Sequence, residues 1–148
     1  MTRSARSIPP VEVEAEGEAA GMAAMVGDLI EANLDGSRAR AWVARRVHGR
    51  VLLEASDRDL GVTVCFDGQR ISVLARREPG ILPAMRGPWL AMTRVCSGLV
   101  SPLQALRRED VKLGLSTPLT ALVATALVMK VPRGVYRDST VNEQPASI

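Results

Sequence analysis

Aromatic residues are scarce in this sequence, at 3% of 148 residues, and lysine occurs only as Lys112 and Lys130. Proteins that follow a nucleic-acid backbone combine a clustered basic face with aromatic side chains on which bases stack. Here Phe66 and Tyr136 are single representatives of their kinds, and the arginines are spread along the chain. The densest basic run, residues 38–50, is interpreted as a solvated helix face. The sequence therefore argues against a nucleic-acid partner.

Histidine and cysteine are also rare, with one His48 and two thiols, Cys65 and Cys96. Two cysteines make neither a disulfide framework nor a metal site, and one histidine cannot form a ligand pair. Glycine-rich phosphate-binding patterns are absent from the sequence. His48 is interpreted as a residue at a helix end and Cys65 as a small packed side chain of a strand. We therefore predict no enzymatic activity, no cofactor and no metal.

Long hydrophobic runs are missing. The longest apolar stretch, residues 119–129, contains threonine and is shorter than the ~20 residues that cross a bilayer. The first residues carry no apolar signal core, because two prolines are followed by alternating glutamates. These features predict a cytoplasmic protein without a transmembrane segment.

The distribution of residues predicts one domain between two polar ends. Residues 1–16 combine arginine, proline and glutamate and are expected to form a flexible arm, and residues 133–148 a flexible tail. Residues 17–132 are expected to form the domain.

Within this domain the hydrophobic pattern alternates between helical and strand periods. Helices are predicted over 18–34 and 37–47, followed by strands over 50–55, 60–66 and 71–75. Asp67-Gly68 is predicted as the two-residue turn of a hairpin. Residues 81–85 are expected as an edge or irregular strand because of Pro83. A helix over 89–95 ending at Gly98, a helix from Pro102, a strand from residue 110 and a helix from residue 117 complete an α+β fold.

The stretch GLVSPLQALRREDVKLG, residues 98–114, is the most informative part of the chain. Ser101 is a good N-cap, and Pro102 suits the first turn of a helix, where its missing N–H is not needed. The order of glycine, Pro-x-x-Ala-apolar helix and short apolar strand resembles the sterol carrier protein 2 (SCP2) family. The resemblance covers about residues 22–129. Members of that family usually carry glycine where Glu109 stands, which implies a different loop here.

The resemblance implies an SCP2-like fold, in which helices cover one face of an antiparallel (mixed) β-sheet of about five strands. It also implies an apolar tunnel between sheet and helices that carries a sterol, fatty-acyl group or other lipid. The last predicted helix is apolar all round and must be covered by a partner chain, a neighbouring helix or a ligand. The candidate cavity residues are Trp89, Met92, Leu99, Leu103, Leu106, Leu119, Leu122 and Val123.

A second interpretation remains open. The protein is then an accessory or scaffold module that forms a homodimer, or docks on an enzyme of a lipid or quinone pathway, through its apolar C-terminal helix. A cavity favours the carrier, and a filled interior favours the scaffold.

Overall fold

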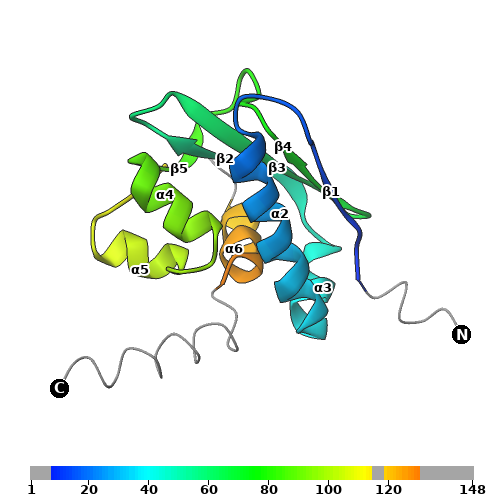
Figure 1. Ribbon diagram of the computed structural model, residues 1–148. Coiled ribbons are helices and arrows are strands. Elements are labelled where there is room, and N and C mark those ends of the chain that lie inside the picture. The colour runs from blue at the N-terminus through cyan, green and yellow to red at the C-terminus, as the bar shows by residue number, and fades with distance from the viewer. Residues whose placement is uncertain (1–7, 115–118, 131–148) are drawn as a thin grey trace, which may run out of the picture.

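A β-sheet forms one layer of the molecule and the helices form a second layer against one of its faces (Figure 1). The computed structural model describes residues 8–114 and 119–130. The strands are β1 (Val11–Val13), β2 (His48–Ala55), β3 (Leu60–Asp67), β4 (Ile71–Leu74), β5 (Pro83–Gly87) and β6 (Lys112–Leu113). The helices are α2 (Ala20–Asp35), α3 (Arg38–Ala44), α4 (Trp89–Cys96), α5 (Pro102–Arg107) and α6 (Leu119–Val128).

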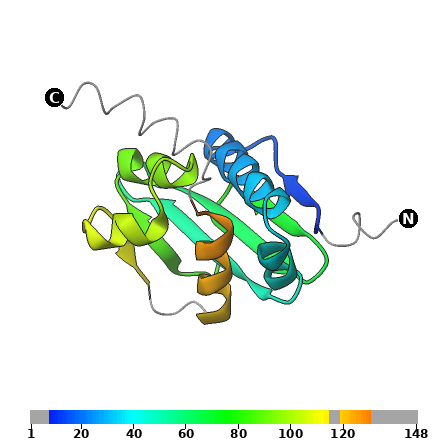
Figure 2. The same cartoon turned by 90° about the horizontal axis from the view of Figure 1, so that it is seen from below.

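The six strands lie in the order β1-β4-β3-β2-β5-β6. The pairs β2–β3, β3–β4 and β5–β6 are antiparallel, whereas β1–β4 and β2–β5 are parallel. Seen from the helical side, all of the described helices lie in front of the sheet (Figure 2). The predicted α+β architecture, with a mixed sheet covered on one face, is confirmed.

The hairpin of β3 and β4 follows from alternating residues around a tight turn. Phe66 pairs with Ile71, so the two central turn residues are Gly68 and Gln69, one position later than predicted. Gly68 has a φ of +85°, a backbone conformation that glycine adopts without steric cost. The Asp67 carboxylate holds the turn by accepting hydrogen bonds from the amides of Gln69 and Arg70, both at 2.8 Å.

The face of the sheet toward the helices forms the core. Alternate residues of β2, β3 and β4 point inward because side chains along a strand alternate between faces. Val51, Val64 and Val73 are fully buried there, and α2 covers them with a stripe that includes Met22 and Ile30. Aliphatic side chains thus build almost the whole core.

The opposite face of the sheet is covered by the connection between β4 and β5. The Thr63 hydroxyl donates to the Arg76 carbonyl oxygen at 2.9 Å and accepts from the Glu78 amide at 3.3 Å. Arg77 lies over Gly61, where an added Cβ would meet its side chain, and pairs with Glu54 at 3.5 Å. Buried Thr63 therefore has hydrogen-bond partners, and charged side chains screen this face.

Strand β1 was not expected, and the prediction of a flexible arm is wrong for Val11–Val13. The Ile71 amide donates to the Pro10 carbonyl oxygen, and the Glu14 amide donates to that of Val73. The β1 strand thereby covers the outer edge of β4. The alternation Val11-Glu12-Val13-Glu14 was a weak strand signal, which the glutamates obscured. Residues 1–7 of the arm and 133–148 of the tail lie outside the described residues.

Two features at the ends of helices are as the sequence predicts, and the end of one helix differs from the prediction. Ser101 caps α5 in a capping box with Gln104, and α4 is followed by Gly98 at a φ of +82°. Helix α3 instead stops at Ala44, and His48 begins β2 rather than ending a helix. Gly49 also lies in β2.

Pro83 stands at the first residue of β5, which lies inside the sheet and not at its edge. Proline has no N–H to donate to a neighbouring strand, and the register between β2 and β5 shifts between Leu52 and Leu53. Of the two predicted alternatives, an edge strand or an irregular strand, the structure shows the irregular strand. This irregular strand forms part of the site described next.

Candidate functional site

An apolar cavity of about 220 Å³ lies between the helices and the β2–β5 part of the sheet. None of its fourteen lining residues is charged. They come from β2, β5, β6, α4, α5, α6 and the residue after α6. The lining consists of Val51, Leu53, Ala84, Met85, Val95, Pro102, Leu103, Leu106, Leu113, Leu122, Val123, Thr125, Ala126 and Met129.

The floor of the cavity is built by β2 and β5. Val51 and Leu53 are inward residues of β2, and each is almost fully buried. Ala84 and Met85 are neighbours in β5, yet both line the cavity, next to the register shift that begins at Pro83. The small side chain at Ala84 leaves space that a larger residue would fill.

Helix α6 contributes side chains both to the core and to the cavity. Ala121 and Ala124 are fully buried, whereas Leu122 and Val123 line the cavity. The Thr125 hydroxyl donates to the Ala121 carbonyl oxygen at 2.8 Å. This bond is made within the helix, so the only hydroxyl of the lining is already satisfied.

Helix α5 forms the other wall, and its position is set by local sequence. The Gln104 amide donates to the Ser101 hydroxyl at 3.1 Å, and Pro102 occupies the first turn. Leu103 and Leu106, three residues apart, then fall on one face of the helix and line the cavity. The motif that carries the family resemblance therefore builds one wall of the site.

The rim of the cavity is apolar and exposed to solvent. Leu103 is 57% exposed, Leu113 44% and Val123 49%. Large apolar side chains that are exposed at the edge of an apolar hollow are typical of a surface that binds a ligand or a partner protein. The rim and the interior together form one continuous apolar surface.

The structure places only part of the predicted set at this cavity. Leu103, Leu106, Leu122 and Val123 line it, whereas Trp89, Met92 and Leu99 do not. Met92 is fully buried in the core, and Leu99 is 58% exposed. The Trp89 ring lies instead below the Arg58 guanidinium, 4.9 Å from ring centre to carbon.

The remaining predicted residue, Leu119, begins α6. Its side chain lies outside the described residues. Whether any of the eight candidates contacts a ligand stays a prediction.

Sequence reasoning missed the sheet residues and the end of α6. Val51, Leu53 and Met85 looked like ordinary core positions, and only the three-dimensional arrangement shows that they face a hollow. Met129 follows the last helical residue. One signal was available in the sequence: β5 begins with Pro83, and the small residue Ala84 follows it.

Asn33 fixes the end of α6 and was also missed. It is a polar residue on the buried stripe of α2 and is only 2% exposed. Its Nδ2 donates to the carbonyl oxygens of Val128 and Lys130, both at 2.7 Å. Because the last carbonyls of a helix lack partners within the helix, Asn33 holds the cavity-lining helix in place.

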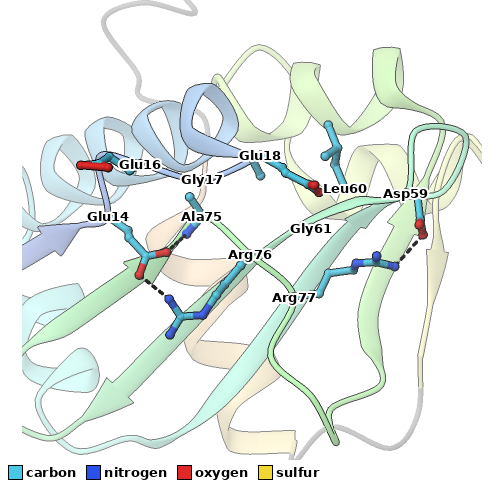
Figure 3. Close-up of a pocket in the computed structure, with 11 residues that line it drawn as sticks. Glu14, Glu16, Gly17, Glu18, Asp59, Leu60, Gly61, Ala75, Arg76 and Arg77 are labelled. Carbon is cyan, nitrogen blue, oxygen red and sulfur yellow. Dashed lines mark hydrogen bonds and ion pairs between the residues drawn. The ribbon is translucent and has the colours of Figure 1, made fainter.

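A second, larger hollow of about 600 Å³ lies at the end of the β3–β4 pair that is opposite the hairpin turn (Figure 3). Its charges are mostly engaged within the protein: Glu14 accepts from the Ala75 amide and pairs with Arg76, and Arg77 pairs with Asp59. These bonds join β1 to the sheet and close the β2–β3 turn. We interpret this hollow as a structural crevice.

The thiols do not show the properties of nucleophiles. Burial raises the pKa of Cys96 to about 12, so its thiol stays protonated near neutral pH. The pKa of Cys65 is also raised, mainly by burial, with Arg50 acting in the opposite direction. His48 is exposed and lies against Gly68, on the face of the sheet opposite the cavity.

Within residues 8–114 and 119–130, no group of three or more histidine, cysteine or acidic side chains is arranged to hold a metal ion. Nor does any helix in these ranges have the length and apolar character needed to cross a membrane.

Comparison with known proteins gives a match of fold. No family model and no curated protein matches the sequence. The structure is similar to that of UbiJ-SCP2, a ubiquinone synthesis protein, with a TM-score of 0.53 over 82% of this chain and 98% of that chain, at 10% identity. It also matches the solution structure of a conserved hypothetical protein of Thermus thermophilus, described as possibly a sterol carrier protein. That match has a TM-score of 0.45 and 15% identity and covers 86% of this chain and 94% of the other.

The fold is therefore SCP2-like, as the sequence resemblance implied. At 10% identity the similarity shows the fold alone.

Proposed function

We propose that this protein binds one apolar chain, such as a fatty-acyl or isoprenoid tail, in the cavity between sheet and helices. The observation that carries the proposal is the unfilled apolar hollow of about 220 Å³, since an ordinary core closes such space by packing. Its uncharged lining offers burial and shape and no anchor for a charged headgroup.

The volume sets which part of a ligand is enclosed. A cavity of about 150 Å³ holds benzene, whereas sites for drug-sized molecules usually have roughly 300–1,000 Å³. At ~30 Å³ for each water-sized group, the cavity has room for roughly seven such groups. A segment of an acyl or isoprenoid chain fits this space better than a whole sterol, which the sequence resemblance had included.

The energetics favour a ligand longer than the enclosed segment. Burying a methylene contributes about 0.8 kcal/mol, so seven contribute roughly 5–6 kcal/mol. Association costs at least about 4 kcal/mol in lost translational and rotational freedom. Contacts of the remaining chain with exposed Leu103, Leu113 and Val123 would add to the affinity, and a polar headgroup would stay in water.

Filling the cavity tests the proposal. Ala126 is exposed and lines the cavity, so Ala126→Trp should occupy it without disturbing the buried core. We expect the wild type to bind a fluorescent fatty acid in solution and Ala126→Trp to bind it at least about tenfold more weakly. Ala24→Trp, on an exposed position of α2, is the matched control and should bind like the wild type. Equal binding by Ala126→Trp, with the fold intact, would contradict the proposal.

The second candidate function is docking on a copy of the chain or on an enzyme of a lipid or quinone pathway. The exposed apolar rim favours it, and so does the similarity of fold to a ubiquinone synthesis protein. Sedimentation at several protein concentrations distinguishes the homodimer from the carrier. A dimer that dissociates in Val123→Glu would favour self-docking, and a monomer at every concentration would count against it.

A further inference from the structure

The surface around α3 carries positive charge that is separate from the cavity. Between Gly36 and Leu53 the chain has five arginines and neither aspartate nor glutamate. Within this stretch Trp42 is 57% exposed, and it is the bulkiest of the exposed hydrophobic side chains in the described residues. Arg38, Arg45 and Arg46 are exposed beside it. We refer to residues 38–46 as the α3 patch.

The arginines of the α3 patch differ from those of the sheet in their partners. Arg70, Arg77 and Arg86 each form an ion pair with a carboxylate. None of the four arginines of the α3 patch does so with any carboxylate of residues 8–114 or 119–130. The positive charge of the sheet is thus locally balanced, while that of the α3 patch is not balanced within this part of the chain.

The α3 patch is held in a defined orientation. Ser37 caps α3, and Ala41 and Ala44 are buried against the rest of the protein. The opposite side of the helix therefore faces water. There the Arg46 guanidinium lies over the Trp42 ring, 4.0 Å from its centre, in a cation–π contact.

We propose that the α3 patch docks the protein on the surface of an anionic bilayer. Indole side chains favour the boundary between headgroups and hydrocarbon, and basic residues near a membrane are attracted by anionic lipids. One exposed tryptophan surrounded by unbalanced arginines combines both features. A nucleic acid would instead be bound by several stacking aromatics along a basic groove.

The position of α3 fits this role. Helix α3 packs against α6, and both cover the same face of the sheet as α5 (Figure 2). The inference rests on the proposed function, because a protein that binds an acyl or isoprenoid chain must collect it where such chains are stored. Docking through α3 would bring the helices that border the cavity to the membrane surface.

Vesicle binding of the full chain tests the inference. Trp89→Phe leaves Trp42 as the only tryptophan, and Trp89 does not line the cavity. We expect Trp42 fluorescence to shift to shorter wavelength with vesicles of phosphatidylcholine that contain about one-third phosphatidylglycerol. Vesicles of phosphatidylcholine alone should give little shift, and salt at about 1 M should reverse the effect.

Charge-matched variants show whether the α3 patch carries the binding. Each arginine near an anionic surface contributes about fivefold to partitioning, so Arg38→Gln with Arg45→Gln should weaken binding roughly 25-fold. Arg70→Gln with Arg86→Gln changes the net charge equally at ion-paired positions and should bind like the parent. Equal loss in both variants, or no loss in either, would overturn the inference. So would binding to a single-stranded oligonucleotide without binding to anionic vesicles.

The two proposals fail separately. Ala126→Trp should keep vesicle binding while losing the fatty acid, and the Arg38, Arg45 variant should keep fatty-acid binding measured without vesicles. If Ala126→Trp loses the vesicles as well, docking depends on the cavity and the α3 patch is not the membrane site.

Discussion

Glu109 occupies a backbone conformation that glycine usually supplies. Its φ is +60°, and it follows α5 in a Schellman arrangement: the Glu109 amide donates to the Leu106 carbonyl oxygen and the Asp110 amide to that of Ala105. Gly98 stands at the equivalent position after α4, with a φ of +82°. The departure from the family pattern at Glu109 thus keeps the turn that a glycine would make, although the sequence implied a different loop.

Glu109→Gly should stabilise the protein. The left-handed conformation costs a residue with a side chain about 1–2 kcal/mol, and the greater freedom of glycine in the unfolded chain offsets part of the gain. We expect the free energy of unfolding in urea to rise by up to about 1 kcal/mol. The reciprocal change Gly98→Ala should lower it by about 1–2 kcal/mol. A lower stability for Glu109→Gly would show that its side chain contributes more than its backbone costs.

Cys96 gives the protein a pH dependence in alkali. Its pKa is raised to about 12 in the folded state by burial, above the value of about 8.5 for an exposed thiol. The thiol therefore makes its full contribution to stability below the pKa that it has in the unfolded chain. This contribution declines as the pH rises from that value to the pKa of the folded protein. The difference in unfolding free energy between wild type and Cys96→Ala should shrink over that interval. A difference that is independent of pH would mean that the thiol is not buried.

The residues of the cavity were predictable only where a local pattern pointed to them. The spacing of Leu103 and Leu106, and the apolar character of the last helix, led to four of the lining residues. Met92 has the same apolar character but faces the core. Periodicity identifies a buried face of a helix, and it does not say whether that face meets side chains or a void.

Among the elements, β1 depends on a close approach between a strand and α2. An added Cβ at Gly27 would clash with a methyl carbon of Val13, so glycine allows β1 to pack against the helix. The sequence signal for this strand was weak because β1 is only three residues long and a glutamate stands between its two valines. The hairpin of β3 and β4, with strong alternation and a glycine turn, was the reliable part of the prediction.

A double-mutant cycle tests the β1 contact. Alanine favours a helix over glycine by about 1 kcal/mol, but the steric conflict with Val13 opposes this gain. We expect Gly27→Ala to destabilise the wild type and to stabilise a Val13→Ala background by about 1 kcal/mol. Additive effects of the two substitutions would show that β1 does not contact α2 in solution.

Asn33 couples α2 to the end of α6 through its two hydrogen bonds to backbone carbonyls. Asn33→Ala leaves both carbonyl oxygens without this donor and should lower the free energy of unfolding by about 1–3 kcal/mol. Glu31→Ala, at an exposed position of the same helix, should change it by less than about 0.5 kcal/mol. Hydrogen exchange should also accelerate in α6 of Asn33→Ala, and unchanged exchange there would contradict the positioning role.

At the scale of the whole molecule, the cavity results from several modest features acting together. An irregular β5, the small side chain of Ala84 and an α6 helix that turns alanines to the core leave space beneath α5. The fold class and the order of elements from α2 onward could be predicted from the sequence because each of those elements has its own local pattern. The cavity could not, since it depends on how far apart the packed elements lie.

The central claim is that this space receives an apolar chain, and methyl NMR of the labelled protein with a medium-chain fatty acid tests it most directly. The account predicts intermolecular nuclear Overhauser effects from the acyl chain to methyl groups of Leu103, Leu106, Leu122 and Val123, and none to the core residues Ile30 and Val73. Contacts confined to methyl groups outside the cavity, or the absence of any contact at saturating fatty acid, would contradict it.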